Sequence, residues 1–201
     1  SIGHSGDSSM EWEKRLRVAL AMAEALVYLH EHNIVHGNLK SSNVLMDKQW
    51  EPHLADYGLA PIALFYPNTK SDMMTYLAPE LLSMGFHPEA ANPSTDVYSF
   101  GVLLLELIIG KSSKATTITP PSNEVKAKIS SGHTLLPQWV ESIDEERWVA
   151  EVFDSKALRS EENFHHIKLE MTQLLKIALS CVVHCDARPT MIEVVSRIND
   201  I

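Results

Sequence analysis

Four polar residues between positions 38 and 56 are of types that could do chemistry together. Asn43 and Asp56 offer oxygen atoms of the kind that Mg²⁺, a hard cation, takes as ligands. Lys40 offers a positive charge that can stabilise negative charge on a transferred group. Asn38 offers an amide, which can hydrogen-bond a hydroxyl group but cannot accept its proton at neutral pH. As single residues, Lys40 and Asn43 would be ordinary surface polar groups, and Asp56 would be an aspartate that caps a turn.

The residues around them form short motifs in a recognisable order. The chain contains HGNLKSSN at 36–43, DYG at 56–58, APE at 78–80, DVYSFG at 96–101 and RPT at 188–190. One such motif would be weak evidence, but five in this order and at these separations are strong evidence. The series resembles the catalytic loop, metal-binding motif, activation-segment end, central helix and late arginine motif of the eukaryotic protein kinase domain. The amino-acid sequences of these motifs are most similar to those of plant leucine-rich-repeat receptor-like kinases.

The resemblance covers nearly the whole chain, from about Trp12 to Ile201. It implies a mainly α fold: the C-terminal lobe of the α+β kinase fold, with short β-ribbons at the catalytic loop on a helical body. Residues 1–201 are therefore expected to form one kinase-like domain. The family's small lobe supplies a glycine-rich loop, a strand lysine and a helix glutamate. No Gly-x-Gly-x-x-Gly occurs here, so we expect the small lobe to be absent.

The resemblance also assigns roles to the four polar residues. Asn38 stands at the position of the catalytic base, where the family has Asp, and Lys40 keeps the position of the catalytic lysine. Asn43 and Asp56 stand at the Mg²⁺-binding and ATP-binding positions. Losing a positioned base costs on the order of 10²–10⁴ in rate. Gly37 replaces the arginine that pairs with a phosphorylated activation loop, so that switch is not expected to operate.

Four further residues are expected to be structural. By resemblance, His36 supports the catalytic loop on the core and does no chemistry. Asp96 is expected to anchor the backbone of that loop, because a buried carboxylate needs hydrogen-bond donors. Glu80 and Arg188 are expected to form a buried ion pair under the activation segment, where such a pair mainly fixes geometry.

Hydrophobic periodicity predicts helices with short strands between them. The first helix should start after Ser8, which stands three residues before Glu11 at capping-box spacing, carry an apolar face from Trp12 and end near Glu31–Asn33. The other expected elements are strands near 34–35, 44–46 and 53–55, helices at 79–82, 96–109 and 169–183, a helical region from Trp139 and a last helix from Pro189. Residues 111–137 are rich in Ser, Thr, Pro and Lys, which predicts an exposed polar insertion.

Composition excludes several classes of function. The 201 residues are 45% hydrophobic and carry a net charge of −9, so phosphate-rich partners such as nucleic acids are repelled. No apolar run approaches the length of a membrane span, and direct membrane insertion by this chain is not expected. Cys181 and Cys185 share a helix face with only His184 nearby, which favours core cysteines over a zinc site of four ligands.

The leading hypothesis is an inactive (pseudo)kinase module of a plant receptor-like kinase. It would lie at the cytoplasmic face of the plasma membrane, or otherwise in the cytoplasm, and signal by binding protein partners such as co-receptor kinases or adaptors. Without the small lobe, we expect Mg-ATP to bind weakly or not at all. Thr69, Ser71 and Thr75 could be phosphorylated, although Ser and Thr are common in any loop.

Two alternatives stay open. One is a weakly active ATP-dependent serine/threonine kinase, formed when the chain is joined to a small lobe. Lys40, Asn43 and Asp56 keep this alternative open, because positioning and charge neutralisation supply much of the rate in phosphoryl transfer. The other is a truncated structural or interaction fragment, which the missing small lobe suggests. The sequence alone leaves it uncertain whether the chain is an enzyme.

Overall fold

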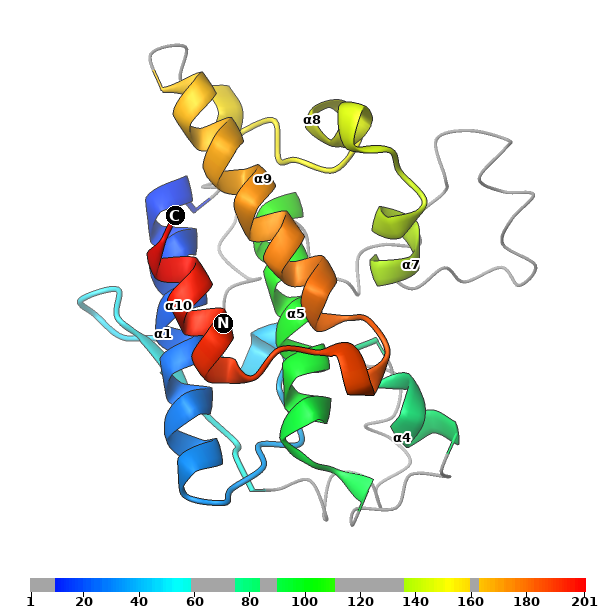
Figure 1. Ribbon diagram of the computed structural model, residues 1–201. Coiled ribbons are helices and arrows are strands. Elements are labelled where there is room, and N and C mark those ends of the chain that lie inside the picture. Colours follow the sequence, from blue (N-terminus) through cyan, green and yellow to red (C-terminus); the bar gives the residue numbers. More distant parts are fainter. Residues whose placement is uncertain (1–9, 59–74, 84–89, 111–135, 160–162) are drawn as a thin grey trace.

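Four helices pack side by side and carry most of the core in the computed structural model (Figure 1). They are α1 (Trp12–Glu31), α5 (Pro93–Ile109), α9 (Phe164–Cys181) and α10 (Met191–Asn199). Within this group α5 packs on α9, and α1 packs on both α5 and α10. The structure describes residues 10–58, 75–83, 90–110, 136–159 and 163–201. The expected mainly helical fold is confirmed.

The remaining elements are short. They are the strands β1 (Val44–Met46) and β2 (Pro52–Leu54), the helices α4 (Pro79–Ser83), α7 (Leu136–Glu141) and α8 (Trp148–Glu151), and the 3₁₀ turns η1 (Ser41–Asn43), η5 (Glu145–Arg147), η6 (Ala157–Arg159) and η7 (Cys185–Ala187). No helix within the described ranges combines the length and the apolar character needed to cross a bilayer.

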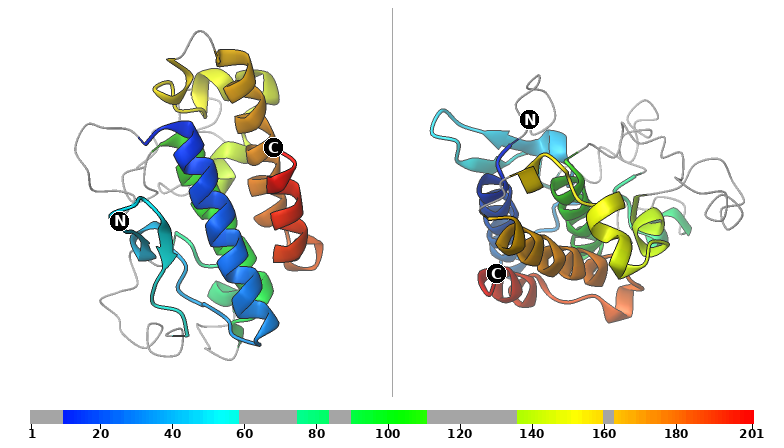
Figure 2. Two further views of the ribbon diagram at one scale, coloured as in Figure 1. Left: turned by 90° about the vertical axis from the view of Figure 1, so that its left-hand side faces the viewer. Right: turned by 90° about the horizontal axis from the view of Figure 1, so that it is seen from above.

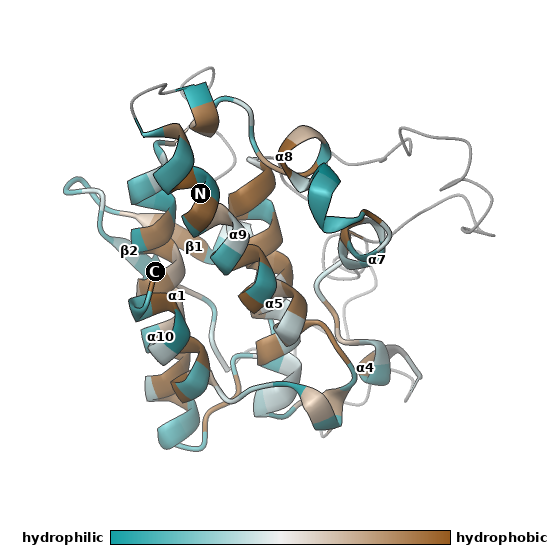
Figure 3. Cartoon of the chain, turned by 45° about the horizontal axis from the view of Figure 1, so that its top comes forward, coloured by the Kyte–Doolittle hydropathy of each residue, from teal (hydrophilic) through white to brown (hydrophobic). Residues whose placement is uncertain are grey.

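The central helix α5 is buried along nearly its whole length, and apolar residues gather where it faces α1 and α9 (Figure 3). It begins earlier than the expected residue 96. The reason is a capping box, in which the Asn92 side chain accepts from the Thr95 amide and the Thr95 side chain accepts from the Asn92 amide. Pro93 occupies the first turn, where its missing amide hydrogen costs nothing. The helix ends at Gly110, whose φ of 71° is easy only for glycine.

The contact between α5 and α9 depends on Gly101. A Cβ atom at this position would lie 2.7 Å from Cγ1 of Val182 and 2.8 Å from Cβ of Cys181. Such distances are below van der Waals contact, so the two helices approach each other only because residue 101 has no side chain. The Cys181 side chain is thereby fully buried.

Helix α1 contains a buried charge that the hydrophobic pattern does not reveal. Arg15 donates to the Asp154 carboxylate at 2.5 Å and to the Leu107 carbonyl at 2.8 Å. These bonds join α1 to the last turn of α5 and to the segment after α8. The helix starts from Glu11, with no side-chain capping bond. Ser8, which was expected to cap this helix, lies outside the described residues.

Strands β1 and β2 form an antiparallel hairpin that lies against α1 (Figure 2). The register pairs Val44 with Leu54, which buries Val44 beneath the hairpin and leaves Leu45 on the outer side. Asp47 closes the turn, because its carboxylate accepts from the amides of Gln49 and Glu51. The hairpin places residue 43 beside residue 55, at the point where the candidate site begins.

Several expected boundaries differ from the observed ones. Residues 34–35 form no strand, β2 starts at Pro52 rather than 53, and α9 spans 164–181 instead of 169–183. The last helix begins at Met191 rather than Pro189, because Thr190 caps it with Glu193 in a second capping box. Most of the expected insertion at 111–137 lies outside the described residues. Its last two positions belong to α7, which begins at Leu136.

Candidate functional site

The segment 36–40 is held to α5 by Asp96. Its two carboxylate oxygens accept from the backbone amides of His36 and Gly37, each at 2.8 Å. His30 Nε2 lies 3.0 Å from the same carboxylate. Asp96 is 1% exposed, so these partners supply the donors that a buried carboxylate needs. Gly37 has a φ of 67°, a backbone conformation in which a side chain is strained.

His36 lies entirely inside the protein, beneath the loop. Its Nδ1 accepts a hydrogen bond from the Asn38 amide at 3.2 Å, which requires a neutral ring with the proton on Nε2. Burial lowers the pKa of His36, and the nearby Asp96 carboxylate opposes this shift without cancelling it. The neutral form is thus favoured on both counts, as suits a residue that supports the loop.

Asn38 and Asn43 are joined across the loop. The Asn43 side-chain nitrogen donates to the Asn38 carbonyl at 2.9 Å, so the Asn43 amide oxygen is the atom left to face a cation. The Asn43 carbonyl accepts from the Ala55 amide at 2.9 Å. Asp56 follows directly, is exposed and has a φ of 63°. The two oxygen donors of a hard-cation site therefore lie on neighbouring backbone segments, and their chemistry fits Mg²⁺.

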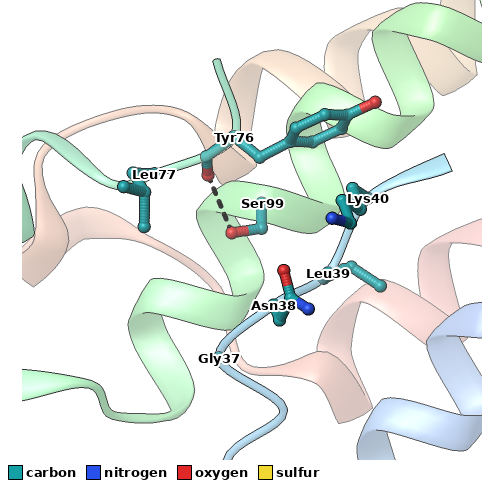
Figure 4. Close-up of a pocket in the computed structure, with 7 residues that line it drawn as sticks. All are labelled: Gly37, Asn38, Leu39, Lys40, Tyr76, Leu77 and Ser99. Carbon is teal, nitrogen blue, oxygen red and sulfur yellow. Dashed lines mark hydrogen bonds between the residues drawn. The ribbon is translucent and has the colours of Figure 1, made fainter. Parts of the chain in front are cut away.

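A cavity of about 10 Å³ opens beside Asn38, enough for about one water molecule. Its walls come from the loop at 36–43, the segment before α4 and the middle of α5 (Figure 4). The lining residues are Gly37, Asn38, Leu39, Lys40, Tyr76, Leu77 and Ser99. The Asn38 side-chain oxygen is buried here and has no hydrogen-bond partner among the described residues. We call Asn38, Lys40, Asn43 and Asp56 the loop edge.

Glu80 and Arg188 form a bidentate ion pair, with oxygen–nitrogen distances of 2.5 and 2.9 Å. The Arg188 side chain is 1% exposed and also donates to the carbonyls of Val183 and Ser94. Its guanidinium lies 5.0 Å from the centre of the Tyr98 ring. Partial burial acts to raise the pKa of Glu80, but the hydrogen bonds and charge of Arg188 outweigh it, and the pKa lies below its usual value. We call His36, Glu80, Asp96 and Arg188 the supporting cluster.

The two cysteines differ in their surroundings. Cys181 is buried in α9, and burial raises the pKa of its thiol to about 12. Cys185 is only partly buried, so the expectation of two core cysteines was wrong for this residue, which lies in η7 beyond the end of α9. The ligand atoms of His184, Cys185 and Asp186 lie within 4.8 Å of one another. Three largely exposed groups fall short of the four ligands of a structural zinc site.

Sequence reasoning missed three hydroxyl-bearing residues at the site. Tyr76 and Ser41 are hydrogen-bonded to each other, and Ser99 donates to the Tyr76 carbonyl at 2.8 Å. Their position was the available signal, since Tyr76 stands two residues before the APE motif and Ser41 lies inside the loop motif. His30, the side-chain partner of Asp96, was also missed, although it follows Ala23 and Leu26 at helical spacing on the buried face of α1.

Comparisons with known proteins agree with the motifs. The family model described as "Protein kinase domain" matches residues 5–197. Two Arabidopsis thaliana proteins, both named "Probable inactive receptor kinase", are 36% identical over 203 residues and 37% identical over 200 residues. Each of these matches covers 98% of this chain and 28% of the relative. The Arabidopsis thaliana "Leucine-rich repeat receptor-like protein kinase PXC1" is 36% identical over 208 residues, which cover 98% of this chain and 29% of that protein. The chain thus spans less than a third of the length of these relatives.

Proposed function

Because the chain belongs to the protein kinase domain family, of the receptor-like kinase type, we propose that it signals by binding other proteins and not by efficient phosphoryl transfer. The observation that carries the proposal is Asn38. Its backbone is held in place by His36 and Asn43, so the loop is ordered although the residue at the base position cannot take a proton. The contacts that hold the loop are present, but residue 38 offers no group that can act as a base.

Protein kinase domains use ATP and Mg²⁺ in general. In this chain Asn43 and Asp56 would hold the metal ion through their side-chain oxygens, and Lys40 would place a positive charge near the phosphates. No hydrogen bond or ion pair joins Lys40 to another described side chain, which leaves its ammonium group available for that role. The bound metal would neutralise phosphate charge. We expect Mg-ATP to bind weakly when only the large lobe is present.

The partners in this proposal are proteins of the same signalling system, co-receptor kinases or adaptors, at the cytoplasmic face of the plasma membrane. Similarity to receptor kinases supports a cytoplasmic domain of a membrane receptor. Gly37 adds a further element. Without the arginine of that position, no side chain is available there to read a phosphate on the activation loop. The state of the loop would therefore not depend on that modification.

The competing function is a weak serine/threonine kinase. Lys40, Asn43 and Asp56 are retained, and part of the rate in phosphoryl transfer comes from positioning and charge alone. Loss of a base leaves such a kinase slower by a factor on the order of 10²–10⁴, which a sensitive assay can still detect. The two proposals therefore differ in a measurable quantity.

The deciding experiment measures transfer of labelled γ-phosphate to a generic protein acceptor by this chain when it is joined to a kinase small lobe. We expect the wild type to give no more product than an Asp56→Ala variant, which removes the metal ligand. Asn38→Asp restores a carboxylate at the base position, and a gain of activity there would show that the base is the part that is missing. Wild-type transfer that disappears in Asp56→Ala would instead establish the weak kinase.

A further inference from the structure

The strongest unassigned feature near the site is the tyrosine that precedes α4. Tyr76 is 2% exposed, and its hydroxyl accepts from the Ser41 amide at 3.3 Å and lies 3.0 Å from the Ser41 hydroxyl. Its carbonyl accepts from the Ser99 hydroxyl at 2.8 Å (Figure 4). One residue therefore joins three segments that are remote in sequence: the catalytic loop, the end of the activation segment and α5.

The position of Ser41 gives this contact its importance. Ser41 is the first residue of η1, and the Asn43 amide donates to the Lys40 carbonyl to form that turn. The same turn sets the side chain of Asn43, which in turn holds the Asn38 carbonyl. Fixing Ser41 thus fixes the half of the loop that Asp96 does not reach, since Asp96 binds only the amides of His36 and Gly37.

We propose that Tyr76 is a positioning residue, which holds the loop edge to the activation segment through Ser41. The link takes over what an arginine–phosphate contact would do at position 37, where this chain has glycine. Its donors and acceptors are neutral hydroxyl and amide groups, so it needs no modification and salt does not screen it. The inference rests on the proposed function only for the purpose that the ordered loop serves. The hydrogen bonds themselves hold the loop whether or not phosphate is transferred.

The test is native-state hydrogen exchange on the 201-residue chain, resolved at the amides of residues 41–43. Tyr76→Phe removes one hydroxyl group, and the matched control is Tyr98→Phe. Both tyrosines are almost fully buried in the same small apolar cluster, which Tyr76, Ala78, Tyr98, Val102 and Val182 form. We expect exchange at 41–43 to be faster by a factor of about 3 to 10 in Tyr76→Phe than in Tyr98→Phe, the range expected when the Ser41 amide loses its acceptor.

Variants at the other end of the contact make the test specific. Ser41→Ala removes the side-chain half of the contact and should raise exchange at 41–43 less than Tyr76→Phe does, and Ser41→Thr should restore the wild-type rate. In the Tyr76→Phe background, Ser41→Ala should add nothing, because the shared bond is already lost. Raising the salt concentration to 0.5 M, about sufficient to screen surface charges, should not change the wild-type rate.

Equal exchange at 41–43 in the two Tyr→Phe variants would overturn the proposal, as would additive effects of Tyr76→Phe and Ser41→Ala. Faster exchange spread over the whole chain in Tyr76→Phe alone would also contradict it, because that result reports general loss of packing. None of these results depends on phosphoryl transfer, so this inference and the proposed function can fail separately.

Discussion

The supporting cluster and the loop edge lie within one site but differ in the burial and hydrogen bonding of their polar side chains. In the supporting cluster, Asp96 and Arg188 are each 1% exposed, by residue and by side chain respectively, and each has several hydrogen-bond partners. At the loop edge, Asp56 is exposed and Asn38 keeps a buried oxygen without a partner among the described residues. Asp96 and Arg188, the charged groups that hold the loop, are satisfied within the chain. The buried Asn38 oxygen has no partner among the described residues, and within the supporting cluster only Nε2 of His36 shares that state.

The difference separates stability from chemistry in this molecule. Removing a buried ionic partner leaves the other group without compensation, which costs several kcal/mol. An exposed side chain can change with little effect on folding. At residue 38 the backbone makes the contacts that hold the loop, because its amide donates to His36 and its carbonyl accepts from Asn43, so a change of side chain there leaves both hydrogen bonds in place. Three measurements test this contrast, and we give them in order of expected size.

The largest effect should follow from Arg188→Met, which keeps most of the volume and removes the charge. Glu80 would lose its partner, and the carbonyls of Ser94 and Val183 would lose a donor. We expect the free energy of unfolding in urea to fall by about 3 kcal/mol or more. Arg147→Met is the control, since the pair of Arg147 with Glu151 is partly exposed and should cost about 1 kcal/mol or less. Similar losses in the two variants would contradict the contrast.

The same substitution at two aspartates gives a direct comparison of the two regions. Asp96→Asn replaces one accepting oxygen by a donor, so an amide of His36 or Gly37 is left without an acceptor. This should lower the unfolding free energy by about 1–3 kcal/mol. Asp56→Asn should change it by less than about 0.5 kcal/mol, because the side chain is exposed and Asn also tolerates a positive φ. Urea titrations of both variants measure the unfolding free energy. A larger loss in Asp56→Asn than in Asp96→Asn would contradict the placing of Asp96 among the stabilising residues.

The smallest effect should be a dependence on pH that comes from His36. Burial holds its pKa below the ordinary value of 6.5, so the unfolded chain binds the proton more readily than the folded one. The stability linked to this group is complete above pH 6.5 and is lost as the pH falls below it, by at most about 1.4 kcal/mol per pH unit. Unfolding free energies of the wild type between pH 7 and pH 5 should decline, and His36→Gln should decline less steeply. If the unfolding free energies of the wild type and His36→Gln declined equally with pH, His36 would not be the cause of the decline. Glu80 does not interfere, because its lowered pKa keeps it ionised throughout this range.

Sequence patterns sufficed for the helices that have a continuous apolar face and for the order of the motifs. The resemblance to the kinase domain suggested that Glu80 and Arg188 meet, and the two side chains are 2.5 Å apart in the structure. Sequence patterns could not reveal Arg15 paired with Asp154, because a charged residue on a helix is normally exposed and its partner lies 139 residues away. The link between Tyr76 and Ser41 stayed hidden for a similar reason. Hydroxyl pairs have no spacing rule, since the two backbones are brought together only by the tertiary fold.

The close approach of α5 and α9 at Gly101 has a consequence for the reactivity of Cys181. The glycine lets the helices close over the sulfur, and burial raises the pKa of the thiol to about 12. At neutral pH the nucleophilic thiolate is therefore almost absent, and no alkylating reagent can reach the sulfur while the two helices remain packed. Cys185, on the partly exposed turn η7, has no such protection. Cys185 is therefore open to labelling in the folded chain, whereas labelling of Cys181 requires α5 and α9 to separate. The labelling rate of Cys181 thus reports how often this part of the core opens.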